Sequence, residues 1–420
     1  MGLRRPLAAA CLALGGCSFQ ADNGAARYRC GEGERCPDGT TCVDGWCERF
    51  DAGQEPLPTC AASDAARISF EDGRSAQTDL AWDGQELGVV WAQAGLGQQI
   101  RFIVAGEDGP GGREPVTLSN PAAPASWPTI GWTGALFGAF FATTPGGTTA
   151  QLAYRAVDPS GNTPSDAPLT LSSSESGAVP MRSQERAKGQ HGVAWQDSLD
   201  GNDEVYFNLY SDGGIGVGEP ILVTENVGAS WFPSLAWTGT EWGVAWNDDR
   251  DGNIEIYFTR LDSRGERIEG DRRISNAPGP SFAPSLIWTG DAYLVSWWDG
   301  RAEPSEMFAA RLVPGAATEI GPEIRLRPGE YGQVGSFASA GERIGLVWHA
   351  WLGELLVPVF ALVDPASGEL VTAPLPLSDG GVSIDPESLA ITGTGDGFAV
   401  AWGDDRSGDV EIYATRVTCE

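Results

Sequence analysis

Short apolar and polar runs alternate along most of the chain, and the pattern recurs with a period of about 51 residues. In the clearest copy, a run at 234–237 is followed by a Thr-Gly turn and by a second run, 243–247, in which apolar and polar residues alternate. An Asp/Gly-rich turn leads to a third run at 254–261, and a further turn leads to a fourth at 272–275. Runs of this length bounded by Gly, Asp and Asn predict β-strands joined by tight turns.

The copies can be counted by an aromatic residue near the end of the second run. There are seven, at intervals of 50 to 54 residues, at Trp91, Phe141, Trp195, Trp246, Trp297, Trp348 and Trp402. Four antiparallel strands repeated in this way indicate the blades of a β-propeller. A β-solenoid uses shorter repeats, and separate sandwiches need about 100 residues each. We therefore expect an all-β protein with a seven-bladed β-propeller of four-stranded antiparallel blades.

The two ends of the repeat region are complementary. Outer strands are expected near Ile68, Val116, Leu169, Ile221, Ile274, Ile324 and Leu375. The first of these precedes any first strand, and the last copy stops after its third strand, at 410–417. The N-terminal strand should complete the C-terminal blade, which closes the ring and removes an open sheet edge. Cys60 and Cys419 flank this seam, and we predict a disulfide between them.

The first sixteen residues are typical of a secretory signal peptide. Arg4 and Arg5 precede a short apolar run at 7–14, and Leu14-Gly15-Gly16 precedes Cys17. This segment resembles a bacterial lipoprotein signal, and the resemblance implies cleavage before Cys17 and lipidation of that residue. An ordinary signal peptide followed by an unrelated cysteine is the alternative. We expect an exported, lipid-anchored protein of the outer membrane, facing the periplasm or the surface.

The chain has eight cysteines, of which Cys11 would leave with the signal peptide and Cys17 would carry the lipid. Six remain, which is an even number in an exported chain and suggests three disulfides. Four lie within residues 30–47, a segment too short to bury a core, so two disulfides should hold it; they are Cys30, Cys36, Cys42 and Cys47. We favour the pairs 30–42 and 36–47, although other pairings and a zinc knuckle stay open. The segment resembles small cysteine-rich modules of surface proteins, including myxobacterial lipoproteins. Residues 17–29 read as a tether, 48–59 as a linker and 60–420 as the propeller.

The charge of the chain excludes some partners. Lys+Arg is 27 and Asp+Glu is 57, which gives a net charge of −30. Such a chain has no cationic surface for nucleic acid or for anionic lipid. The apolar fraction of 41% is enough for a core. A protein or polysaccharide partner at the cell surface remains, with membrane contact through the anchor only, and we expect a monomer.

Four copies share a charged hairpin. An aspartate follows the second-strand tryptophan by two residues, a glutamate lies in the third strand, and three copies add an arginine in the turn. The sets with arginine are Asp248, Arg250 and Glu255; Asp299, Arg301 and Glu306; and Asp404, Arg406 and Glu411. The two acids should lie opposite each other, with the guanidinium bridging both. Because the set recurs around the ring, we interpret it as structural.

The third copy lacks the arginine and carries Asp197, Asp200, Asp203 and Glu204. Several oxygen ligands in one turn suit Ca²⁺, so calcium is one interpretation of this copy. A solvated acidic turn is the other.

Aromatic residues precede several first strands, on the expected face of the charged turns: Trp127, Trp231, Phe232, Phe282 and Tyr331. Around a central pore they could stack on sugar faces or anchor a partner protein. The alternative is that they pack between blades.

The repeat resembles that of sialidase-like propellers, mainly in architecture. Sialidases have six blades, and their Ser-x-Asp-x-Gly-x-x-Trp turn motif is absent here, as are their arginine triad and Tyr/Glu pair. Only His191 and His349 are present, so no His-rich metal centre is available, and no Gly-x-Ser-x-Gly elbow is found. We identify no catalytic residue and expect a non-enzymatic envelope binding or scaffold protein without a cofactor. The alternatives are a glycan hydrolase or lyase with acids on the pore face, and a purely structural envelope component.

Overall fold

The computed structural model divides the chain into two compact units, Met1–Leu57 and Pro58–Glu420. In the second unit it describes residues 58–420 except 96, 148, 173–177, 180–183, 188, 199–200, 302–304, 327–331 and 379–383. In the first unit it describes four strands, paired in the order β1-β2-β4-β3: β1 (Phe19–Asp22), β2 (Ala25–Arg29), β3 (Thr40–Val43) and β4 (Trp46–Arg49). Cys42 and Cys47 are backbone partners across β3 and β4. The predicted signal peptide, Cys17, Cys30 and Cys36 lie outside the described residues, so the lipid anchor and the pairing within 30–47 stay predictions.

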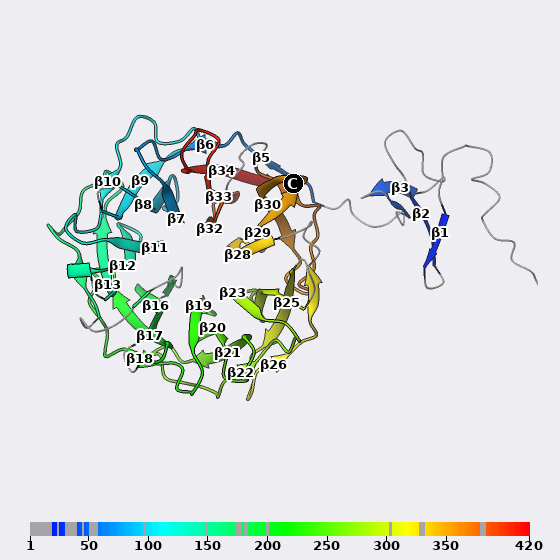
Figure 1. Ribbon diagram of the computed structural model, residues 1–420. Coiled ribbons are helices and arrows are strands. Elements are labelled where there is room, and N and C mark those ends of the chain that lie inside the picture. Colours follow the sequence, from blue (N-terminus) through cyan, green and yellow to red (C-terminus); the bar gives the residue numbers. More distant parts are fainter. Residues whose placement is uncertain are drawn as a thin grey trace, which may run out of the picture. The chain divides into compact units, whose positions relative to one another are not determined.

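The second unit is the predicted seven-bladed propeller of four-stranded antiparallel blades, which confirms the expected fold class (Figure 1). Blades one to three consist of β7 (Ser75–Trp82), β8 (Leu87–Gln93), β9 (Gln99–Ala105) and β10 (Val116–Thr117); β11 (Ala125–Trp132), β12 (Phe137–Thr143), β13 (Gln151–Val157) and β14 (Leu169–Thr170); and β15 (Gln184–Ala187), β16 (Gln190–Asp197), β17 (Glu204–Ser211) and β18 (Ile221–Leu222). A 3₁₀ turn, η3 (Pro145–Gly147), lies between β12 and β13.

Blades four to six follow the same order, with the first strand innermost. They consist of β19 (Ser230–Trp237), β20 (Trp242–Asp248), β21 (Glu255–Leu261) and β22 (Arg272–Arg273); β23 (Ser281–Trp288), β24 (Tyr293–Asp299), β25 (Glu306–Val313), β26 (Glu319–Ile320) and β27 (Ile324–Leu326); and β28 (Gly332–Ala340), β29 (Arg343–Leu352), β30 (Leu355–Val363) and β31 (Leu375–Pro376). In blade five, β26 and β27 both pair with β25 and share the outer position.

Blade seven joins the two ends of the propeller. It consists of β32 (Ile384–Gly393), β33 (Gly397–Asp404) and β34 (Glu411–Cys419), completed by β5 (Cys60–Ala62) and β6 (Ala66–Arg67). Both N-terminal strands pair with β34. Cys60 and Cys419 are backbone partners and form a disulfide. The predicted closure of the ring and the predicted seam disulfide are therefore confirmed.

The core lies between the blades. One cluster combines Val205 and Phe207 of blade three with Val244 and Trp246 of blade four. The aromatic residues that count the repeats, such as Trp91 and Trp246, are fully buried in these interfaces. Close packing also explains the repeated glycine after the first residue of the second strand. A Cβ on Gly243 would lie 2.4 Å from the Tyr293 ring of the next blade. The part of the chain that the model describes contains no helix of the length and apolarity needed to cross a membrane.

Candidate functional site

The charged hairpins have the predicted register. Asp197 and Glu204, Asp248 and Glu255, Asp299 and Glu306, and Asp404 and Glu411 are backbone partners across strands two and three. Seven of these eight acids are buried, the exception being Glu306. Buried carboxylates are stable only when hydrogen-bonded, so their partners define what the hairpin does.

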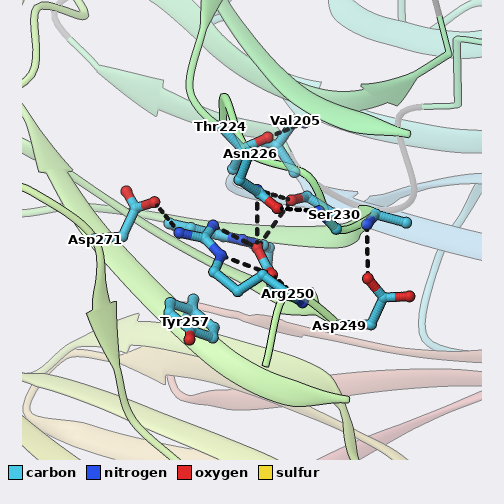
Figure 2. A network of polar contacts seen from close by, with 12 residues as sticks. Val205, Thr224, Asn226, Ser230, Asp249, Arg250, Tyr257 and Asp271 are labelled. Carbon is cyan, nitrogen blue, oxygen red and sulfur yellow. Dashed lines mark hydrogen bonds and ion pairs between the residues drawn. The ribbon is translucent and has the colours of Figure 1, made fainter. Parts of the chain in front are cut away.

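The arginine does not bridge the two acids, so that expectation is wrong. Arg250 donates from Nε to Asp248 Oδ1 at 2.7 Å and from Nη2 to Asp248 Oδ2 at 2.5 Å, and its Nη1 bonds Asp271 at 2.7 Å (Figure 2). Its backbone N–H also donates to Asp248, which folds the turn back onto that residue. Arg301 binds Asp299 in the same way, whereas Nε and Nη2 of Arg406 both donate to Asp404 Oδ2.

The glutamates instead receive an arginine and a hydroxyl from the outer strand. Arg273 and Ser275 donate to Glu255 at 2.6 and 2.5 Å. Ser281 of the next blade lies 3.4 Å from Glu255 and 3.3 Å from Asp299, so one hydroxyl connects the acids of two blades. Arg67, Ser69 and Ser75 surround Glu411 in the same way across the seam. Through these contacts the repeated acids hold neighbouring blades together.

The calcium candidates of blade three are only partly within the described residues, because Asp200 is not. Asp197 accepts from the Trp195 indole at 3.3 Å, and Glu204 accepts from Asn202 at 3.0 Å and from Thr224. The Asp203 backbone carbonyl accepts from the Ser230 N–H. Over the described residues, no three His, Cys, Asp or Glu side chains are grouped as a metal ion requires. Calcium binding stays a prediction.

The inner strands of all seven blades line a central cavity of about 600 Å³. The exposed edge of each inner strand carries unpaired N–H groups, and polar side chains of the preceding blade satisfy several of them. Asp79 accepts from the Ile130 N–H at 3.0 Å, and Ser234 accepts from the Leu286 N–H at 3.0 Å. The wall is therefore preorganised by blade-to-blade contacts.

Two of the predicted ligand aromatics, Trp127 and Phe232, line this cavity. Both have a φ of 54° at bulges in the inner strand, and Gln77 and Ala283 have the same conformation at the equivalent bulges of blades one and five, so this backbone conformation belongs to the repeat. Trp231 and Phe282 do not line it, and Phe282 packs on the core between blades five and six. Tyr331 lies outside the described residues.

Blade three breaks the pattern of the channel wall. The inner-strand residue opposite the start of the second strand is tryptophan in four blades: Trp82, Trp132, Trp237 and Trp288. In blade three it is Arg186, opposite His191. The two preceding positions hold Gln184 and Glu185, where the same four blades hold Leu or Ile and then Ala, Gly or Ile. Blades six and seven also lack the tryptophan and have Ser339 and Gly393 there, so blade three is distinguished by the charged pair Glu185 and Arg186. A repeat explains what the blades share, so a charged pair in one blade points to function.

The blade-three residues form a connected cluster behind the wall. The Gln184 amide donates to His191 Nδ1 at 2.7 Å, and Arg186 binds Asp212 at 3.1 Å. His191 is fully buried, and burial lowers its pKa to about 4, so the ring is neutral. Among the described residues its Nε2 has no hydrogen-bond partner, and it lies 3.6 Å from Asp212. The buried indole nitrogens of Trp242, Trp298 and Trp348 are in the same state, so this feature alone does not mark a site.

Glu185 faces the channel and is exposed to it. Because protein surrounds the channel on all sides, the ionised carboxylate is poorly solvated there, and its pKa rises to about 7. No described residue forms a hydrogen bond or an ion pair with it, and no charged neighbour contributes to the pKa shift.

The Glu185→Gln variant should have a pH-dependent stability advantage. Glu185 has a pKa of about 7 in the folded protein and 4.5 as its ordinary value, so the folded state binds the extra proton and stability falls as pH rises between these values. The melting temperature of the variant should equal that of the wild type at pH 4 and exceed it at pH 8. The exposed Glu342→Gln should show no such trend. Thermal scans by circular dichroism at both pH values measure this, and parallel curves would refute the assignment.

No protein-family model matches the chain, and no curated protein matches it. Among solved structures, it is similar to a puromycin-hydrolysing peptidase of Mycobacterium tuberculosis, with a TM-score of 0.50 and 12% identity over 80% of this chain and 53% of that one. A prolyl endopeptidase matches with a TM-score of 0.50 and 13% identity over 81% of this chain and 47% of that one. The chain thus spans about half the length of each. A neuraminidase-like protein of little yellow-shouldered bat origin matches with a TM-score of 0.44 and 8% identity over 86% and 100%. The two likenesses with a TM-score of 0.50 show the fold alone.

The aromatic pattern of the sequence pointed to one end of the channel and missed Gln184, Glu185, Arg186, His191 and Asp212. The sequence did contain a signal, because Arg186 occupies the position at the end of the first strand where four other blades have a tryptophan. It was obscured because blade three departs from the repeat over that whole strand.

Proposed function

We propose that the protein is an exported, lipid-anchored binding protein of the cell envelope whose ligand occupies the central channel of the propeller. The observation that carries this proposal is the wall of the cavity. It is lined by aromatic residues from several blades, and one blade replaces the apolar pattern with Gln184, Glu185 and Arg186. Concave sites of this volume that combine aromatic walls with a few polar groups are a usual form of ligand site.

A polysaccharide end fits the channel better than a folded partner does. The volume of about 600 Å³ matches small ligands and chain segments. Tryptophan rings at both ends of the inner strands, such as Trp127 and Trp237, offer flat faces for sugar rings. The lipid on Cys17, which remains a proposal, would hold the propeller at the membrane.

The test is a glycan array probed with the full-length exported protein in detergent, with the supernatant assayed for released sugar. Saturable binding without release supports the proposal, and the Trp237→Ala variant should then lose most of it. Binding that depends on Ca²⁺ would support the calcium interpretation of the blade-three hairpin. No binding to any glycan would overturn the proposal in favour of a protein partner or a structural role.

A glycan hydrolase or lyase is the competing proposal, and one observation favours it. A carboxyl with a pKa of about 7 can act as a general acid near neutral pH, and Glu185 has this property in the channel. Release of sugar that is lost in Glu185→Gln would establish this alternative.

A further inference from the structure

Glu185 is an unpaired acid in a site that otherwise satisfies its charges. Asp79, the other acid on the channel wall, accepts from the Thr129 hydroxyl and the Ile130 N–H at 2.9 and 3.0 Å. Arg186 is paired with Asp212. Glu185 has no such partner among the described residues, and the neighbouring strands β11 and β19 contain no titratable side chain. Among the described residues, the charged groups around it are thus Asp79, Arg186 and Asp212, and His191 is neutral. Arg182 and Lys188, which flank β15 in the sequence, lie outside the described residues.

The carboxylate lies next to an aromatic face. Side chains alternate along β15, so Glu185 leaves the same side of the strand as Ala187. Ala187 belongs to the core cluster that contains Leu235 and against which Trp237 packs. Trp237 also lines the cavity, so an acid and an indole flank one stretch of wall between blades three and four.

We propose that Glu185 and Trp237 form a site in the central channel for a protonated amine carried on a small or sugar-sized body. A carboxylate supplies the counter-ion, and an indole face attracts an ammonium group through its quadrupole. Of the described residues, those that line the channel include the acids Asp79 and Glu185 and one base, Arg186, and the chain has a net charge of −30, so a cation is also attracted from a distance. This inference rests on the proposed function and names its ligand class.

The ligand pair that tests it differs only in charge. Glucosamine tetrasaccharide carries protonated amines, and N-acetylglucosamine tetrasaccharide carries neutral amides on the same chain. Isothermal titration of the full-length protein at pH 7, where Glu185 is about half ionised, should give at least several-fold tighter binding of the amine form. Glu185→Gln should abolish this preference, whereas Glu342→Gln, which removes one charge from an exposed site, should keep it. Trp237→Ala should weaken both sugars.

A pH series separates the charge of the site from that of the ligand. Nα-acetyl-lysinamide keeps its charge to a pH of about 10, so only the protein titrates below that value. Its affinity should rise about tenfold from pH 6 to pH 8 as Glu185 ionises, with proton release at pH 6 in buffers of different ionisation enthalpy. The Gln variant should show neither effect.

The outcomes are distinct. If the glucosamine oligomer binds most tightly, the result supports an amino sugar as the ligand. If the lysine amide binds more tightly than the glucosamine oligomer, the result supports the same amine site with a ligand whose amine is not on a sugar. Equal binding of both sugars by the wild type and by Glu185→Gln overturns the amine inference and leaves the channel as a ligand site. No binding of any of the three probes overturns the amine inference, whereas the proposed function is overturned only if the glycan array also shows no binding.

Discussion

The Cys60→Ser/Cys419→Ser double variant should unfold at a much lower urea concentration than the wild type. The disulfide joins residues 359 apart, and in the loop-entropy model a closed loop of that size contributes at most about 6 kcal/mol to the free energy of unfolding. It also holds β5 against β34, where Thr59 and Glu420 exchange backbone hydrogen bonds at 3.1 and 2.9 Å. Without the disulfide, the unfolded chain gains conformational entropy. In the folded state β5 is then held only by its pairing with β34, so an edge of the blade-seven sheet can open.

The measurement is urea unfolding followed by tryptophan fluorescence, with both cysteines replaced so that no free thiol remains. Adding a reductant to the wild type is the less specific control, because it also reaches the cysteines of residues 30–47. An unchanged midpoint in the double variant would show that the strand pairing alone closes the ring.

Asp248→Ala should destabilise the propeller by about 3–5 kcal/mol, which is the cost of leaving buried donors without an acceptor. Asp248 is fully buried and accepts from the Trp246 indole and the Ser230 hydroxyl, each at 2.9 Å, as well as from Arg250. Arg250 keeps Asp271 after the substitution, whereas the two buried donors keep nothing of equal strength.

Two further variants make this result specific. Asp248→Asn retains an acceptor oxygen and loses the charge, so its loss of stability should be smaller. Glu266→Ala removes an exposed acid from the same blade and should change the unfolding free energy by less than about 0.5 kcal/mol. If Asp248→Ala changes the unfolding free energy no more than Glu266→Ala does, the hairpin does not hold the blades together.

The fold could be predicted because each blade repeats the same local physics. Alternating runs, turn residues and a buried aromatic define the four strands, and the unmatched strands at the two ends define the closure. The seam disulfide followed from the same count, since Cys60 and Cys419 occupy the place of a hairpin.

The partners of the repeated acids could not be predicted from local spacing. Arg250 is two residues from Asp248 and folds back onto it, so it is out of place for Glu255. The arginine that reaches Glu255 comes from the outer strand, 18 residues further on. The sequence does contain this signal, because Arg67-Ile68-Ser69 and Arg273-Ile274-Ser275 repeat the same three residues before two blades.

The candidate site was harder, because it is defined by departure from the repeat. Reading the aromatic residues found Trp127 and Phe232 but also Trp231 and Phe282, which lie away from the cavity. Neighbouring residues of an inner strand point to opposite sides, and only the register shows which of them reaches the channel. Glu185 and Arg186 become visible only when the seven inner strands are placed in register.

Closure of the ring by the first strand determines when the protein can finish folding. Blades one to six can pair their own strands as the chain emerges, since their contacts are local. Blade seven needs β5 and β6 from the beginning of the propeller and β34 from its end. Cys60 therefore has no native partner until Cys419 has been synthesised, so the seam disulfide can form only after all seven blades are present in the chain.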